Sequence, residues 1–196
     1  KKGNLPKLYA SRFNRILKKS TEKIDSMNFR EYNLFVVYEI LNLVRDAKLG
    51  LKKEELFAFY DYIAPNWIKL ISPICPHIAE ELWSKLGKKN IVSLESWPEY
   101  DESKINDKLE MEERNVDKTI EDIRNIINIV KEKQNKEVSK VYIYVIPKEL
   151  SYYNEKELTA KLNIETKVYA VNDKNKYDPE NKSKKAIPGR PGIYII

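Results

Sequence analysis

The chain has 196 residues, 42% of them hydrophobic, and a formal net charge of +6 at pH 7. This length allows one large or two small domains with a buried core. No run of about 20 apolar residues and no signal-peptide pattern occurs, so we expect no membrane span and a cytoplasmic location. A single cysteine, Cys75, and a single histidine, His77, exclude an internal disulfide and a typical four-ligand Cys/His zinc site.

Basic side chains gather at the two ends of the sequence. Residues 1–23 carry eight basic and one acidic side chain, and residues 131–196 carry 14 and nine. Residues 24–130 carry 14 basic and 20 acidic side chains. Such clusters are typical of a surface that binds a polyanion. The alternative is a lysine-rich surface that serves only solvation.

The first expected helix spans residues 8–24. Its apolar residues recur at helical spacing, which predicts that one side packs in a core. Four cations follow at intervals of three and four residues and share one stripe of the helix: Arg12, Arg15, Lys19 and Lys23. Like charges at this spacing repel, so we expect phosphates or an acidic neighbour to face them.

Two further helices are expected over residues 29–48 and 52–67. Gly50 is a candidate C-cap of the first, and Pro65 is expected to kink the second or cut it in two. The second contains many aromatic side chains, which could stack on bases. Their spacing covers one helix face, so we predict that they pack in the core.

Residues 70–83 form the densest motif, Leu-Ile-Ser-Pro-Ile-Cys-Pro-His-Ile-Ala-Glu-Glu-Leu-Trp. Pro73 and Pro76 remove backbone donors, so one helix must kink or stop here, and a fourth helix is expected over residues 77–86. The residues expected to share one apolar face of it are Ile78, Leu82 and Trp83.

The ionisable residues of this motif do not predict a catalytic group. His77 has no second imidazole and no nucleophile motif beside it, so we predict a structural role. Glu80 and Glu81 are adjacent on a helix and point about 100° apart, so they do not converge on one substrate.

The C-terminal part of the chain mixes helix and strand. Apolar residues repeat every three to four positions through residues 108–134, which predicts a long helix whose seam packs inward. Alternating residues predict strands over 138–146 and 164–171, with a helical segment between them. Residues 172–185 are polar and predict a mobile loop, and residues 193–196 predict a last strand.

These elements predict the fold class α+β. A mainly α-helical, antiparallel bundle is expected over residues 1–107. A small α+β domain is expected over residues 108–196, with its long helix against one face of the sheet.

The motif of residues 70–83, followed by Trp97-Pro98, closely resembles a signature in the tRNA-binding helical domain of class Ia aminoacyl-tRNA synthetases. Ser72 and Cys75 are small departures from that pattern. The resemblance implies that His77 caps and orients helices. Residues 178–195, which end in Lys-Ala-Ile-Pro-Gly-Arg-Pro-Gly-Ile-Tyr-Ile, resemble the ending of archaeal-type leucyl-tRNA synthetases. The chain is thus similar to a C-terminal fragment of such a ligase.

The resemblance implies that the full-length enzyme is a leucine–tRNA ligase, which uses ATP with Mg²⁺ in an upstream catalytic domain and edits mischarged tRNA in an inserted domain. This chain has neither His-Ile-Gly-His nor Lys-Met-Ser-Lys-Ser, so we expect no catalytic residue, cofactor or metal here. The expected partners are tRNA-Leu, held by its body and long variable arm, and the other domains of the same polypeptide. The expected tRNA-binding residues are Arg12, Arg15, Lys19, Lys23, Lys182, Lys184, Lys185 and Arg190.

Other interpretations remain open. The equivalent region of a valyl, isoleucyl or methionyl synthetase shares the first motif, and only the terminal motif argues against it. A free-standing tRNA-binding protein would show the same basic regions. A protein-interaction module would show the same helical seam.

Overall fold

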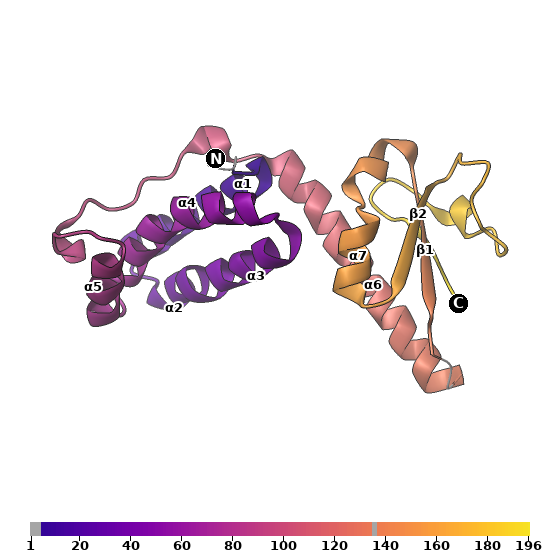
Figure 1. Ribbon diagram of the computed structural model, residues 1–196, viewed down its shortest axis with the longest axis horizontal. Coiled ribbons are helices and arrows are strands. Elements are labelled where there is room, and N and C mark those ends of the chain that lie inside the picture. Colours follow the sequence, from indigo (N-terminus) through magenta and orange to yellow (C-terminus); the bar gives the residue numbers. More distant parts are fainter. Residues whose placement is uncertain (1–4, 135–136) are drawn as a thin grey trace. The chain divides into compact units, whose positions relative to one another are not determined.

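The computed structural model describes residues 5–134 and 137–196, so Lys1 and Lys2 of the N-terminal basic cluster lie outside the described residues. The chain divides into two compact units, Lys1–Asp107 and Lys108–Ile196. The first is a helical bundle, and the second is a small sheet with helices against it (Figure 1). The predicted α+β class, a mainly helical part followed by a small mixed part, is confirmed.

The helical unit is built from α1 to α5. Their bounds are Lys7–Asp25 for α1, Phe29–Asn33 for α2, Ile40–Gly50 for α3, Lys53–Ile71 for α4 and Pro76–Lys85 for α5. A π-helical turn, Leu34–Glu39, joins α2 to α3. Short 3-10 segments at Val92–Leu94 and Glu102–Lys104 follow α5.

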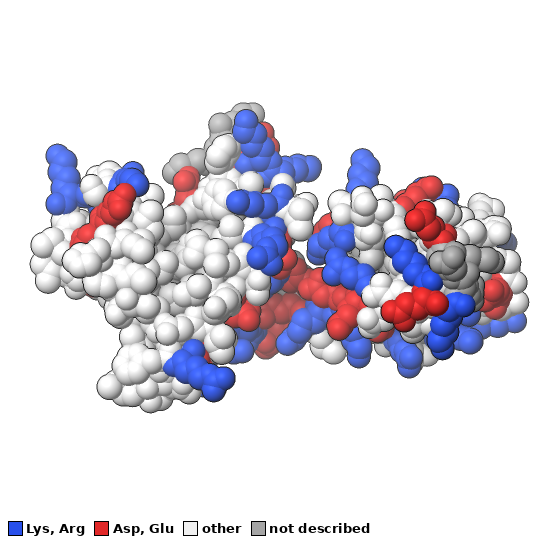
Figure 2. All heavy atoms as spheres, turned by 90° about the horizontal axis from the view of Figure 1, so that it is seen from below, with Lys and Arg blue, Asp and Glu red and all other residues white. Residues whose placement is uncertain are grey.

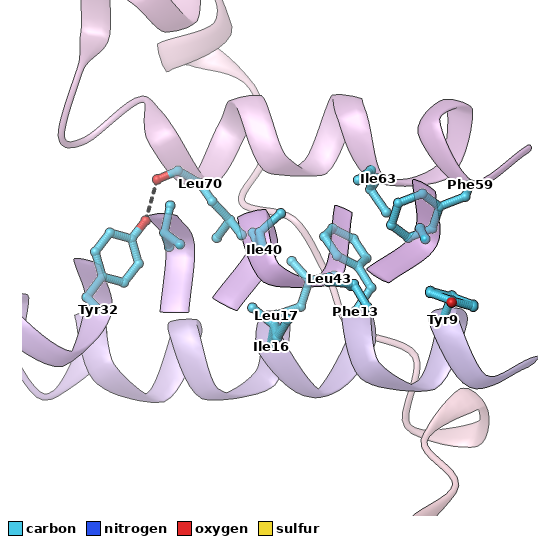
Figure 3. Close-up of a cluster of buried hydrophobic side chains, with 12 residues drawn as sticks. Tyr9, Phe13, Ile16, Leu17, Tyr32, Ile40, Leu43, Phe59, Ile63 and Leu70 are labelled. Carbon is cyan, nitrogen blue, oxygen red and sulfur yellow. Dashed lines mark hydrogen bonds between the residues drawn. The ribbon is translucent and has the colours of Figure 1, made fainter. Parts of the chain in front are cut away.

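The core of the bundle lies between α1, α3 and α4 (Figure 3). Phe13 and Leu17 of α1 pack there with Leu43 of α3 and with Phe59 and Ile63 of α4, all of them at most 1% exposed. The prediction that the α4 aromatics pack in the core is confirmed for most of them. Phe57 is the exception, because it is 57% exposed.

Two expectations about helix ends are corrected. Pro65 does not cut the helix in two, because α4 continues through it to Ile71. The proline removes the donor for the carbonyl of Asp61, but Asp61 is exposed, so water can satisfy that carbonyl. Gly50 is the last residue of α3, and extended backbone follows at Leu51 with φ −97°, so Gly50 is not a left-handed cap.

The predicted apolar face of α5 was wrong for two of its three residues. Trp83 and Ala79 are buried one turn apart and pack against Ile68 of α4. Ile78 and Leu82 lie on another side of α5 and are 56% and 37% exposed. On the face drawn in Figure 2, the helical unit shows broad areas with few charged side chains.

The polar residues of α5 have separate roles. The Glu80 carboxylate accepts hydrogen bonds from the Val92 N–H at 2.9 Å and from Ser93, while Glu81 pairs with Lys85. The prediction that the two glutamates do not converge is therefore confirmed. His77 is exposed and, among the described residues, makes no hydrogen bond or ion pair, so the predicted capping role is wrong.

The second unit contains a three-stranded mixed sheet. The strands are β1 (Lys140–Val145), β2 (Glu165–Ala170) and β3 (Gly192–Ile195), in the order β2-β1-β3. β1 pairs with β2 in parallel and with β3 in antiparallel orientation. The helices are α6 (Asp107–Gln134) and α7 (Glu155–Leu162), with 3-10 segments at Pro147–Tyr152 and Lys182–Lys185. The helix expected between the first two strands is thus split into a 3-10 segment and α7.

One face of this sheet forms the core of the second unit. Ile123 and Ile127 of α6 pack with Val141, Ile143 and Val145 of β1. The prediction that the α6 seam packs inward against the sheet is confirmed. At the outer edge of β2, residues of α7 accept two backbone hydrogen bonds: Thr159 Oγ1 from Thr166 at 3.1 Å and Glu155 Oε1 from Val168 at 2.9 Å.

The expected loop over residues 172–185 is anchored to the sheet. The Tyr144 hydroxyl of β1 donates to the carbonyl of Tyr177. The segment then ends in the 3-10 turn Lys182–Lys185, which lies beside β3. Apolar spacing did not predict this anchor, because a tyrosine hydroxyl reaches a backbone carbonyl from another part of the chain.

Candidate nucleic-acid interface

Three of the four cations of the α1 stripe have acidic partners within the helical unit. Arg12 pairs with Asp46 of α3 at 2.9 Å. The other pairs are Arg15 with Asp107 and Lys23 with Glu31. Acidic neighbours, one of the two expected ways to relieve the repulsion, are therefore present. Three of the cations are therefore paired with residues of three different elements, so the four do not form one continuous surface of unpaired positive charge.

Lys19 differs from the other three. Its side chain is exposed, its Nζ lies 5.5 Å from the centroid of the Phe35 ring, and the described residues give it no ion pair. Partly exposed ion pairs contribute only about 0–1 kcal/mol, so a phosphate could replace the acidic partner of a neighbouring cation at little cost. Lys19 is thus the stripe residue most available to an incoming anion.

Three of the C-terminal cations line one cavity in the second unit. Lys182, Lys185 and Arg190 surround a cavity of about 520 Å³ together with Asp122 and Asn125 of α6. Lys182 also pairs with Glu180 at 3.1 Å. With three cations and one carboxylate on its wall, the cavity favours an anion.

Lys184 lies apart from this set. It lines a neighbouring hollow of about 570 Å³ together with Lys174, Lys176, Asp173 and Asp178. Lys176 Nζ is already used there, because it donates to the carbonyls of Val171 and Asp173 at 2.9 and 3.3 Å. The structure therefore brings Lys182, Lys185 and Arg190 together but does not bring Lys184 to them.

The backbone that carries Lys182 is organised by Asp178. The carboxylate accepts the N–H groups of Lys182 at 2.7 Å and Ser183 at 3.0 Å. Partial burial acts to raise the pKa of Asp178, but the hydrogen bonds from Ser183 and Lys182 outweigh it and hold that pKa below its ordinary value. Asp178 therefore stays ionised and fixes the start of the 3-10 turn.

Two glycines set the backbone around Arg190 and Lys182. Gly189 has φ +72°, and its N–H donates to Glu149 Oε1 at 2.9 Å, which fixes the turn before Arg190. A Cβ on Gly192 would lie 2.3 Å from the carbonyl oxygen of Lys182. Gly192 therefore lets the start of β3 pass close to the backbone of Lys182.

Sequence reasoning did not identify Asp178 and Glu149 as positioning residues. Asp178 precedes a Pro-Glu-Asn turn, and an aspartate that accepts N–H groups a few residues later is a known turn pattern, so a local signal existed. Glu149 is 40 residues from Gly189 in sequence, and no local pattern connects them.

Within residues 5–134 and 137–196, no group of three or more His, Cys, Asp or Glu side chains could hold a metal ion. The described helices also include none with the length and apolar content needed to cross a membrane. Among the described residues, several cations of the two expected binding regions are held in place by carboxylates and turns.

Comparison with known proteins decides the family. Residues 7–143 match the family model described as the anticodon-binding domain of tRNA ligase. The chain belongs to this family. The match of the anticodon-binding domain runs from the start of α1 through α6 and into β1.

Archaeal leucine–tRNA ligases are among the relatives of this anticodon-binding domain. The leucine–tRNA ligase 2 of Metallosphaera sedula is 36% identical over 150 residues, which are 73% of this chain and 15% of the relative. The enzyme of Staphylothermus marinus is 35% identical over 129 residues, 66% of this chain and 13% of the relative. That of Archaeoglobus fulgidus is 28% identical over 97% of this chain.

The chain spans only about 13–25% of the length of these curated relatives. The predicted similarity to the C-terminal, tRNA-binding part of archaeal leucyl-tRNA synthetases is confirmed as homology to that class of ligase.

Proposed function

We propose that this chain is the tRNA-binding part of a leucine–tRNA ligase and that it holds tRNA-Leu for leucylation in a catalytic part of a longer, cytoplasmic polypeptide. The observation that carries the proposal is the family match over residues 7–143, joined to 36% identity with an archaeal leucine–tRNA ligase over 73% of the chain. The ligand and the amino acid come from those relatives, and the cations described above supply the chemistry.

The ATP chemistry of such a ligase belongs elsewhere in the polypeptide. The described residues offer no carboxylate cluster suited to Mg²⁺, and the sequence contains no glycine-rich phosphate-binding motif. We therefore assign no catalytic step to this chain. It contributes binding energy and orientation, which convert a bimolecular encounter into a positioned complex.

The two cationic regions would contribute differently. On α1, Lys19 would meet the phosphate backbone first, and Arg12, Arg15 and Lys23 would exchange an acidic partner for a phosphate. In the second unit, Lys182, Lys185 and Arg190 line one cavity and would bind a single phosphate or a short stretch of backbone, with Lys184 beside them. Contacts to phosphates fix the position of an RNA without reading its sequence.

The test is a salt titration of tRNA-Leu binding to the 196-residue chain. A triple variant, Lys182→Gln, Lys185→Gln and Arg190→Gln, is compared with a control that removes the same charge from exposed positions of α6: Lys118→Gln, Lys131→Gln and Lys133→Gln. We expect the first variant to lower the slope of log K against log salt by roughly 0.7–0.9 for each lost phosphate contact. The control should change the slope by much less.

The tRNA specificity needs a second comparison. Wild-type chain is titrated with tRNA-Leu and with tRNA-Leu whose variable arm has been shortened. Tighter binding of the intact tRNA supports the assignment to leucine. Equal binding of both, or no measurable binding of either, overturns the specificity or the whole proposal, respectively.

A further inference from the structure

The two faces of the small sheet have different compositions. Side chains alternate along a strand, so β1 places Val141, Ile143 and Val145 toward α6 and places Tyr142 and Tyr144 on the opposite face. Tyr169 of β2 lies on that second face because it is paired with Tyr144, and Tyr194 of β3 lies there because it is paired with Tyr142. One face is aliphatic and the other is a layer of tyrosines.

These rings form one connected cluster, which we call the tyrosine face: Tyr142, Tyr144, Tyr169, Tyr177 and Tyr194. The Tyr142 centroid lies 6.3 Å from that of Tyr169, 6.1 Å from that of Tyr194 and 5.1 Å from that of Tyr177. The planes of Tyr142 and Tyr169 differ by only 14°. The members are contributed by all three strands and by the loop after β2.

The outer members of the tyrosine face reach solvent. Tyr142 and Tyr144 are buried, but Tyr169 and Tyr194 are only half-buried and Tyr177 is 48% exposed. If this face served only to hold the loop, aliphatic residues like those on the other face would fill it. Tyrosine instead keeps large apolar rings available at a water-exposed surface, which is the property of stacking platforms in RNA-binding sheets.

Cations border the tyrosine face. Lys167 is paired in register with Tyr142, and Lys140 Nζ lies 5.8 Å from the Tyr142 centroid. At the β3 edge, the cavity of Lys182, Lys185 and Arg190 is also lined by Ile193 and by Asp122 of α6, so it lies on the α6 side of that edge and not on the tyrosine face. Aromatic rings beside cations are complementary to a nucleotide, whose base stacks and whose phosphate is anionic.

We propose that the tyrosine face stacks unpaired bases of a bound RNA on Tyr169 and Tyr194, with the adjoining phosphates at Lys140 and Lys167. That the RNA is tRNA rests on the proposed function. The stacking itself does not, because it needs only an unpaired strand. Paired bases are already stacked in a duplex and cannot lie on the rings, so the face would select loops and single strands.

The test uses the 196-residue chain and three fluorescently labelled probes: an unpaired octauridine, a blunt RNA duplex and tRNA-Leu. The double variants are Tyr169→Leu with Tyr194→Leu, which removes both rings, and Tyr169→Phe with Tyr194→Phe, which keeps them. We expect the leucine variant to bind octauridine about tenfold or more weakly. The phenylalanine variant should bind within about twofold of wild type, and duplex binding should stay equal in all three proteins.

A second readout locates the contact directly. Octauridine with one 5-iodouridine is cross-linked by light to the wild-type chain, and the modified residue is identified by mass spectrometry. We expect Tyr169 or Tyr194. The stacking proposal would be overturned by cross-links at other residues or by a wild-type chain that does not bind octauridine. It would also be overturned if the leucine variant bound octauridine as tightly as wild type, or if the phenylalanine and leucine variants lost equal affinity.

The outcomes separate the two proposals. A wild-type chain that binds octauridine but not tRNA-Leu overturns the proposed function and leaves the stacking face in place. The other outcome is that the wild-type chain binds tRNA-Leu and the leucine variant binds octauridine and tRNA-Leu as tightly as wild type. In that case the tyrosines only hold the loop to the sheet.

Discussion

The hydroxyl of Tyr32 donates a hydrogen bond to the backbone carbonyl of Leu70 at 2.5 Å (Figure 3). Leu70 lies in the last turn of α4, where carbonyls lose their helical donors. Pro73 has no N–H to offer, and the N–H of Ile74 goes to the carbonyl of Ile71. Tyr32 thus supplies the donor that the end of the helix leaves missing, and burial raises the pKa of its phenol, which keeps it protonated.

Tyr32→Phe should destabilise the bundle by about 1–3 kcal/mol, because the buried Leu70 carbonyl would keep no partner. The measurement is urea unfolding followed by far-ultraviolet circular dichroism. Tyr38→Phe is the control, since Tyr38 is 62% exposed. If both variants unfold at the wild-type urea concentration, water reaches Leu70 and the hydroxyl is dispensable.

Trp83→Ala should cost about 3–5 kcal/mol, since the ring is 3% exposed and fills the space between α4, α5 and Val92. Trp97→Ala should cost less, because that ring is only half-buried and donates one hydrogen bond to Thr21. Urea midpoints give the comparison, with Leu94→Ala, at an 82% exposed position, as the control. A Trp83→Ala midpoint equal to that of the control would contradict the packing described for α5.

Glu80 should make the stability of the bundle depend on acid pH. Hydrogen bonds from the N–H of Val92 and then from Ser93 hold the pKa of Glu80 below its ordinary value of 4.5. Its contribution is therefore present above about pH 4.5 and is lost as pH falls through the lower folded-state pKa. Glu80→Gln should destabilise at pH 7, and the gap to wild type should narrow below pH 4.5. Glu99→Gln, at an exposed position, should show no such pH-dependent gap.

Gly192→Ala should displace the Lys182–Lys185 turn, because the new Cβ would lie 2.3 Å from the Lys182 carbonyl oxygen. We expect a cost of about 1–3 kcal/mol for this overpacking, together with weaker RNA binding. Pro191→Ala, at the adjacent residue, is the control. Stability and binding equal to the control would show that the turn can move without consequence.

Substitution tests the C-terminal region better than truncation. Removal of residues 185–196 would delete β3, whose residues pair with β1 from Val141 to Tyr144. A loss of tRNA binding after such a deletion would report a broken sheet as readily as a lost contact.

Where one element's own periodicity decides the outcome, the sequence predicted the fold well. The seam of α6, the limits of α1 and the strands around Ile143 and Val168 follow from spacing alone. Prediction failed where a tertiary partner decides. The buried side of α5 depends on its contacts with Ile68 and Val92. Likewise, α4 continues through Pro65 because the carbonyl of Asp61, which loses its donor, faces water.

The cationic residues show the same division. Their spacing predicted a stripe on α1 but could not reveal the partners Asp46, Asp107 and Glu31, since each depends on how a distant segment folds back. The grouping of Lys182, Lys185 and Arg190 around one cavity depends on the Gly189–Glu149 contact across 40 residues. Local sequence patterns carry no information about contacts between segments that are so far apart in the chain.

The two side-chain acceptors from α7 at the outer edge of β2 have a consequence for how this protein behaves at high concentration. An edge strand with open N–H groups invites a strand of another molecule to join the sheet. The N–H groups of Thr166 and Val168 are occupied, so intermolecular growth of the sheet on this side is blocked. The amide protons of Thr166 and Val168 should therefore exchange with deuterium more slowly than those of an open edge strand. Loss of the Glu155 carboxylate would free the Val168 N–H, so we expect aggregation to increase before the stability of the fold falls.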